Sequence, residues 1–232
     1  MRFTDETTRS VWTLGLSVVL LMLICSGTRA DTYGFQAISD NSGASSAIAG
    51  QLTVEISPYG DTSDQVLFTF VNGISASYNG NIMQIFFDDR DGLGAVTGLE
   101  EPDALGVDFK QTVKNNRAFP EGKHLTPAFD VTDFVVFDGG KGKIGPGEYL
   151  GVVYSLADGV TFQDVIDAIQ NGVSGPLRVG IHVGGIAPAV LRDDSDSFIM
   201  VHVPVPEAVL LGAWGIGTAG LYLRRRRDLA NA

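Results

Sequence analysis

The chain has 232 residues, of which 27 are acidic and 16 are basic, and its formal net charge at pH 7 is −11. Between residues 31 and 203 the imbalance grows to 23 acidic against nine basic side chains. Because like charges repel, this acidity disfavours binding to nucleic acid, to anionic lipid and to strongly acidic polysaccharide. It favours instead a protein whose charge keeps it soluble outside the cell.

Residues 1–30 have the pattern of a secretory signal peptide. Arg2 and Arg9 supply positive charge ahead of an apolar core at residues 11–25. Thr28 and Ala30 are small residues at the spacing that signal peptidase accepts. We therefore expect signal peptidase to cleave after Ala30, which makes the protein an exported one.

The single cysteine, Cys25, lies inside this signal segment. Its removal would leave a mature domain with no disulfide and no thiol chemistry. Two alternatives are an uncleaved N-terminal anchor and a lipid-modified Cys25. The first is disfavoured because the apolar core is short for a full membrane span, and the second because Ile24 stands where a small residue is needed.

Residues 31–203 have the length of one domain with its own core. Their apolar side chains recur with a period near two, which predicts strands, and glycine-rich turns separate them. Strands are expected at residues 51–57, 66–70, 82–87, 147–156, 177–183 and 197–203, with weaker ones at 33–39, 105–109 and 134–137. The pattern predicts an all-β fold, an antiparallel β-sandwich.

One helix interrupts the strand pattern at residues 161–169, where the apolar residues fall on one face. Thr161 and Asp164 have the spacing of a capping box, and Gly172 can end the helix. We expect the helix to cover an open end or edge of the sheets. Residues 41–46 are expected to form a polar loop, and residues 98–126 an irregular one.

Two acidic turns are the strongest candidates for a metal site. Asp88, Asp89 and Asp91 follow one predicted strand, and Asp193, Asp194 and Asp196 precede another. Carboxylate oxygens suit Ca²⁺, but the spacing departs from the EF-hand pattern. The favoured interpretation is a pair of polar turns next to strands. A shared calcium site would become credible if both turns lay at one end of the domain.

No motif for catalysis stands out. The histidines His124, His182 and His202 form no His-x-x-x-His pair, and no Gly-x-Ser-x-Gly motif occurs. The glycine-rich residues 139–145 lack the Ser or Thr that follows the lysine of a phosphate loop. A pair of carboxylates for glycoside cleavage stays open because the chain holds many acids. We expect a protein that is not an enzyme.

Exposed aromatic side chains could stack on sugar rings. Tyr33, Tyr59, Tyr78 and Tyr149 lie near predicted turns. The two tryptophans, Trp12 and Trp214, lie outside residues 31–203. Their absence from the domain counts against sugar binding.

Residues 204–232 combine three features in a fixed order. A proline-containing segment precedes the uncharged apolar residues 208–223, and a basic stop follows, formed by Arg224, Arg225, Arg226 and Arg227. As a helix the apolar run would measure about 24 Å at ~1.5 Å per residue, somewhat short of the ~30 Å core of a bilayer. The arginines would stay in the cytoplasm and place the domain outside. A permanent anchor and a processing signal both fit these features.

This ending resembles the PEP-CTERM sorting signal of bacterial surface proteins. The motif reads Val205-Pro206-Glu207-Ala208, in which Ala208 replaces the second proline. The resemblance implies an exosortase, a membrane transpeptidase that cuts near the motif, with Glu207 as the recognition residue. It also implies a host that makes exopolysaccharide and a final location at the cell surface or in the extracellular matrix.

The domain also resembles, loosely, a group of β-sandwich proteins that carry such tails. The similarity rests on residues 50–56, 66–72, 86–89 and 177–183, and it implies a fold and a location but no reaction. The sequence thus predicts a non-catalytic surface or matrix protein with a structural or interaction role. Its expected partners are signal peptidase, an exosortase-like enzyme, the inner membrane through its tail, and exopolysaccharide. The alternatives are a calcium-dependent carbohydrate-binding or adhesion module and a hydrolase that uses two carboxylates.

Overall fold

The computed structural model describes residues 30–61, 64–74, 78–101, 107–112, 118–137, 142–187 and 194–202. The chain divides into two compact units, Met1–Val201 and His202–Ala232. All the strands described below belong to the first unit.

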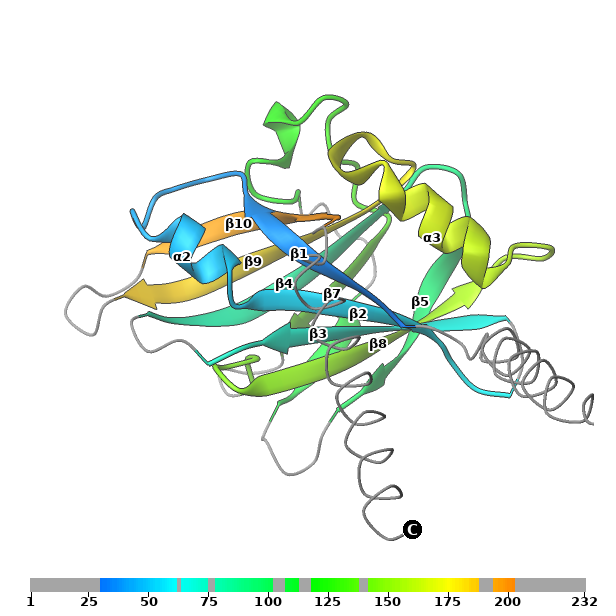
Figure 1. The fold of residues 1–232 in the computed structure, drawn as a ribbon, viewed down its shortest axis with the longest axis horizontal. Coiled ribbons are helices and arrows are strands. Elements are labelled where there is room, and N and C mark those ends of the chain that lie inside the picture. Colours follow the sequence, from blue (N-terminus) through cyan, green and yellow to red (C-terminus); the bar gives the residue numbers. More distant parts are fainter. Residues whose placement is uncertain are drawn as a thin grey trace, which may run out of the picture. The chain divides into compact units, whose positions relative to one another are not determined.

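Within these described ranges, ten strands form one sheet in the order β5-β8-β3-β2-β1-β10-β9-β4-β7-β6 (Figure 1). Every pair of neighbouring strands is antiparallel. The strands are β1 (Asp31–Ala37), β2 (Leu52–Pro58), β3 (Gln65–Asn72), β4 (Asn79–Asp89), β5 (Gly94–Glu100), β6 (Phe109–Thr112), β7 (Asp133–Phe137), β8 (Glu148–Leu156), β9 (Leu177–Ala187) and β10 (Ser195–Val201). The prediction of an antiparallel, mainly β fold is confirmed.

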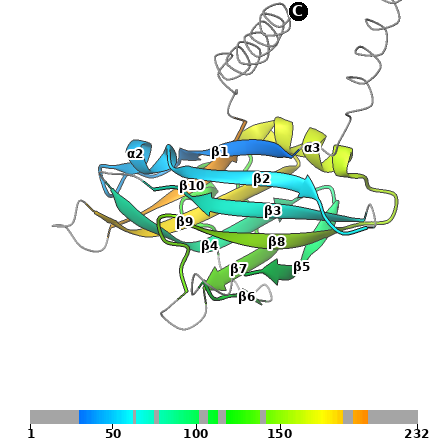
Figure 2. The ribbon, with the colours of Figure 1, turned by 60° about the horizontal axis from the view of Figure 1, so that its bottom comes forward.

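The sheet curls until its two halves pack face to face (Figure 2). Phe68 on β3 and Phe87 on β4 are separated by four strands in the sheet order, yet their ring centroids lie 5.3 Å apart. The two edge strands also meet, since Gln111 Nε2 of β6 donates to Val96 O of β5 at 2.5 Å. The described domain is therefore one nearly closed sheet with the core inside it.

Alternation along the strands builds this core. Leu52, Val54 and Ile56 of β2 are fully buried, as their spacing predicts. The inner faces of β3, β8, β4 and β9 contribute Phe68, Phe70, Val152, Tyr154, Phe87, Val179 and Ile181 to the same cluster. Each large apolar side chain buried in this way contributes about 1.5–3 kcal/mol. A core of this size needs no disulfide.

A second, smaller apolar cluster lies on the other face of β4 and β7. Phe86 packs against Phe119 and Phe134, with ring centroids 5.0 and 4.8 Å away. Gly180 on the neighbouring β9 makes room for Phe119, because a Cβ atom there would lie 2.6 Å from the Phe119 ring. The segment around Phe119 thereby covers part of the outer surface of the sheet.

Two α-helices lie near opposite ends of β1 in both views (Figures 1 and 2). α3 (Phe162–Gln170) has the predicted capping box between Thr161 and Asp164, and its apolar face joins the main core. α2 (Ser45–Ala49) begins at the end of the polar loop predicted at residues 41–46 and overlaps that loop only at residues 45 and 46. It forms there because Ile48 is completely buried in the core, a contact that local sequence does not reveal.

The prediction of an irregular region at residues 98–126 is wrong in part. β5 extends into this region, and both β6 and the short 3₁₀ helix η1 (Gly122–His124) lie within it. A second 3₁₀ helix, η2 (Gly172–Ser174), follows α3. β5 shows weak alternation because only its Val96 is fully buried and its pairing with β8 shifts between Val96 and Gly98. The weak strand expected at residues 105–109 is β6, displaced toward the C-terminus.

Candidate functional site

Asp88, from the first acidic turn, is a buried structural residue. It lies directly across from Arg178 in the β4–β9 pairing and forms an ion pair with it. Arg178 is only 1 % exposed and also donates to the carbonyl oxygens of Pro127, Ala128 and Val173. Arg90 contributes a second ion pair to Asp88 at 3.2 Å. The Asp88 carboxylate and its arginine partners thus hold the segment around Ala128 against the sheet, and the carboxylate oxygens already accept hydrogen bonds from protein groups.

Asp89 points to the opposite face, into the core. Its Oδ2 accepts hydrogen bonds from the Tyr154 hydroxyl at 2.7 Å and from the Gly94 amide at 3.0 Å. Burial raises the pKa of Tyr154, and the bond to Asp89 raises it further, so the phenol stays protonated and donates. Asp91, two residues on, is exposed. The three acids of this turn therefore face three different environments.

Asp196, from the second acidic turn, organises the loop after β1. It is fully buried and accepts bonds from Ser39 Oγ, the Asn41 amide and both the amide and hydroxyl of Ser42. Burial alone would raise the pKa of this carboxyl, but these four bonds outweigh it and lower the pKa. Asp194 is half-buried, and Asp193 lies outside the described residues.

The two acidic turns lie near opposite ends of β9. Asp88 pairs with Arg178 at the start of that strand, whereas Asp196 pairs with Val183 near its far end. Five residues of strand separate them by about 16 Å. The structure does not bring the two turns together, and among the described residues no group of three or more His, Cys, Asp or Glu side chains could hold a metal ion.

The histidines lie in three separate settings. His124 is exposed beside Glu121, with 3.3 Å between Nε2 and Oε2, and His202 follows the end of β10. His182 is half-buried on β9, 3.2 Å from the Ser197 hydroxyl, and burial lowers its pKa. An imidazole with a lowered pKa is neutral at pH 7.

The glycine-rich turn leads into a strand. Its described part, residues 142–145, forms one bridge between Ile144 and Ile82 and is followed by β8. A phosphate loop leads instead into a helix, whose N-terminus holds the phosphate. The described part of this segment therefore lacks the helix that a phosphate loop requires.

The predicted processing sites lie almost entirely beyond the described region. Ala30 is its first residue and immediately precedes β1. The sorting motif at Val205, Pro206, Glu207 and Ala208 and the stop at Arg224, Arg225, Arg226 and Arg227 lie outside the described residues. No helix in the described part of the chain is long and apolar enough to cross a membrane.

Of the four tyrosines considered for stacking, Tyr149 is the exposed one. Tyr33 is 2 % exposed, with its pKa raised to about 12 by burial. Tyr59 donates to Glu100, and Tyr78 packs against the core. Tyr149 is 44 % exposed and Ile74 is 83 % exposed, and these are the exposed large apolar side chains of the described residues.

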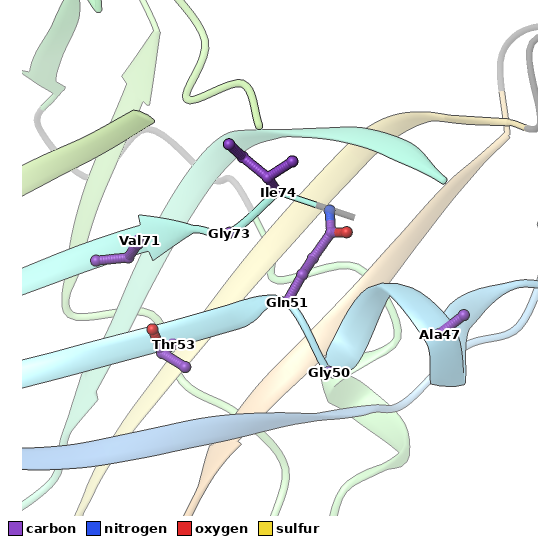
Figure 3. A pocket seen from close by; sticks show the side chains of 7 residues that line it. All are labelled: Ala47, Gly50, Gln51, Thr53, Val71, Gly73 and Ile74. Carbon is purple, nitrogen blue, oxygen red and sulfur yellow. The ribbon is translucent and has the colours of Figure 1, made fainter. Parts of the chain in front are cut away.

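A surface depression lies beside Ile74 (Figure 3). Its volume is about 510 Å³, and it is lined by Ala47, Gly50, Gln51, Thr53, Val71, Gly73 and Ile74. Thr53, Val71 and Tyr149 are direct partners across β2, β3 and β8, so they share the outer face of the sheet. Ile74 reaches Gly147, since a Cβ atom on that glycine would lie 3.3 Å from its side chain.

A buried amide network lies next to the depression. Asn72 is completely buried, and its Nδ2 donates to the carbonyl oxygens of Gly80 and Ile144 at 2.7 and 2.9 Å. Its Oδ1 therefore faces Gln51 and accepts from Gln51 Nε2 at 2.9 Å. This fixes the orientation of the Gln51 amide. Within the described structure its Oε1 is buried and has no hydrogen-bond donor.

Sequence reasoning missed this network, although one sign of it was present. Asn72 continues the alternation of Val66, Phe68 and Phe70, so a polar side chain falls at a core position. Such a residue must find partners inside the protein.

No protein-family model, curated protein or solved structure matches this chain. Its function is therefore inferred from its own residues and geometry.

Proposed function

We propose that the chain is an exported, non-catalytic surface or matrix protein whose C-terminal segment is a sorting signal for an exosortase-type transpeptidase. The position of the last strand carries the proposal. β10 ends at Val201, three residues before Pro204 and six before Glu207. A cut at the motif would remove none of the described strands from the sheet.

β10 is a central strand of the domain, which supports this separation of roles. It pairs with β1 on one side and with β9 on the other through residues 195–201. The folded domain thus retains all its described strands without the residues that follow. A removable tail requires this independence, because a signal that contributed a strand could not be cut off without unfolding the domain.

The N-terminal end has a similar arrangement. Ala30 directly precedes β1, so signal peptidase would leave that strand intact. The inner membrane would hold the unprocessed protein through residues 208–223, with the arginines in the cytoplasm and the domain outside. The face-to-face packing of the two halves of the sheet supports placing the domain with the β-sandwich proteins that carry such tails.

Substitution of the motif tests the proposal. In the native host, Glu207→Ala should accumulate in the inner-membrane fraction at full size, because the transpeptidase no longer recognises the motif. Glu55→Ala removes the same charge from an exposed position on β2 and should be processed normally. Ala208→Pro restores the second proline of the motif and should be processed at least as well. Immunoblots of cell fractions measure each outcome, and normal processing of Glu207→Ala would overturn the role of Glu207.

A further inference from the structure

We propose that the depression beside Ile74, hereafter the Gln51 depression, is a calcium-independent binding site for a neutral saccharide. The inference goes beyond sorting and rests on the proposed function only in that export would bring the domain into contact with polysaccharide. Three observations carry it: an apolar rim, an unused buried acceptor and a lining without charge.

The apolar rim consists of Ile74 and Tyr149. These are the exposed large apolar side chains of the described domain; Ile74 lines the depression, and Tyr149 is the strand partner of the lining residue Val71. They come from separate segments, one after β3 and one in β8, that the sheet brings together. Isolated exposed apolar residues need no explanation, but one that lines a hollow and one next to its lining indicate a contact surface. The face of a sugar ring is rich in C–H groups and stacks on such side chains.

The acceptor is Gln51 Oε1. Gln51 is 9 % exposed, lines the depression and extends toward the segment that carries Gly73 and Ile74 (Figure 3). Its amide cannot reverse without breaking the bond to Asn72, so Oε1 stays without a donor in the described structure. A buried acceptor left unpaired is unfavourable, because it has lost its hydrogen bonds to water and gained none inside the protein. A sugar hydroxyl that reaches Oε1, which the surrounding residues cover in this structure, would supply the missing donor.

The lining selects against charged ligands. None of the seven lining residues is ionisable. The nearby Glu148 is already bonded to the Gly145 amide at 2.5 Å. With a net charge of −14 over residues 31–203, the domain would repel an anionic ligand. Because the depression contains no carboxylate, binding there does not require calcium.

An added peptide strand fits the site less well. Peptides that extend a sheet use the free backbone groups of an edge strand. β2, β3 and β8, which lie under and beside the depression, each have a neighbour on both sides. A second copy of the chain is also disfavoured, because a stable interface buries about 800 Å² on each partner. The small hollow with one inward acceptor suits one or two sugar rings.

Saturation-transfer NMR on the full chain tests the inference. The protein is held in lauryldimethylamine oxide, a detergent without a sugar headgroup, and mixed in turn with cellobiose, lactose and chitobiose. We expect transfer to the ring C–H protons of at least one disaccharide, unchanged by a calcium chelator. Tyr149→Ala and Ile74→Ser should each weaken binding at least tenfold. Leu67→Ala, on the same outer face of β3 but away from the depression, should leave binding unchanged.

Other outcomes would overturn the inference. These are no transfer to any of the three sugars, equal transfer in wild type, Tyr149→Ala and Ile74→Ser, or binding that disappears with the chelator. Transfer only to an end-blocked tetra-alanine peptide, or Tyr149-dependent dimerisation in sedimentation velocity, would identify a different partner. Thermal melts establish that the variants are folded, and both substituted side chains are exposed. The result is independent of the processing assay, so either proposal can fail without the other.

Discussion

At the scale of single residues, three of the six acids that first suggest a calcium site are held by structural contacts within the fold. Asp88 binds Arg178, Asp89 binds Tyr154 and Gly94, and Asp196 binds the loop after β1. Except for Gly94, which is five residues from Asp89, these partners lie far away along the chain, 90 residues in the case of Arg178. Sequence spacing alone could not reveal them. Gln51 and Asn72 are 21 residues apart, and sequence spacing does not reveal their pairing either.

Asp196→Asn should destabilise the domain. The change removes the charge from an acceptor of four hydrogen bonds and turns one oxygen into a donor group facing donors. We expect a loss of about 2 kcal/mol, which lowers the midpoint of thermal unfolding by about 4–8 °C. Asp194→Asn, two residues earlier and half-buried, is the matched control and should change little.

Asp196 should also make the stability of the domain fall at acidic pH. Because the folded-state pKa of Asp196 is lowered, its stabilisation is present above the unfolded-state pKa of about 4. It is lost as the pH falls through the lower, folded-state value. The difference in unfolding free energy between wild type and Asp196→Asn should therefore shrink below pH 4. A difference that stays constant down to pH 2 would contradict this role.

At the scale of elements, alternation and capping were enough to predict most of the domain. β2, β3 and β8 were predictable because each has an apolar inner face, and α3 because its cap and its apolar stripe agree. β5 could not be predicted, because it contains glycines, pairs irregularly with β8 and fully buries only Val96. α2 depends on Ile48, whose burial is a tertiary contact.

The cap of α3 offers a direct test at this scale. Thr161 Oγ1 accepts from the Asp164 amide at 3.3 Å, and the Asp164 carboxylate accepts from the Thr161 amide at 2.8 Å. Thr161→Ala should cost about 1 kcal/mol and lower the unfolding midpoint by about 2–4 °C. Gln170→Ala, an exposed change in the last turn of the same helix, should have little effect. Equal effects of the two changes would argue against the cap.

At the scale of the whole molecule, side chains close the sheet where backbone pairing stops. Gln111 donates to Val96 O, Glu101 accepts from the Phe109 amide, and Asp89 accepts from the Gly94 amide. Asp133 of β7 also lies where the two edges of the sheet meet, hereafter the seam, and its carboxylate accepts a hydrogen bond from the Val96 amide. Its pKa is raised, first by burial and then by the charge of Asp89. The seam therefore contains two mutually repelling carboxylates.

Asp133→Asn should stabilise the domain at neutral pH. A raised folded-state pKa means that the contribution of Asp133 is most favourable below the unfolded-state pKa of about 4 and is lost as the pH rises through the folded-state value. Asparagine keeps an oxygen for the Val96 amide and removes the repulsion. We expect a gain of about 1 kcal/mol at pH 7, or about 2–4 °C, that disappears at pH 3. A variant less stable than wild type at pH 7 would contradict this view of the seam.

The molecule as a whole combines a self-sufficient sheet with a tail that contributes no described strand to it. Mass spectrometry of the C-terminus of the protein isolated from its native host tests that division most directly. The account predicts a terminus near Glu207 and no peptide from residues 208–232 in the protein recovered from the surface or matrix. Surface protein that still contained residues 208–223 would contradict it.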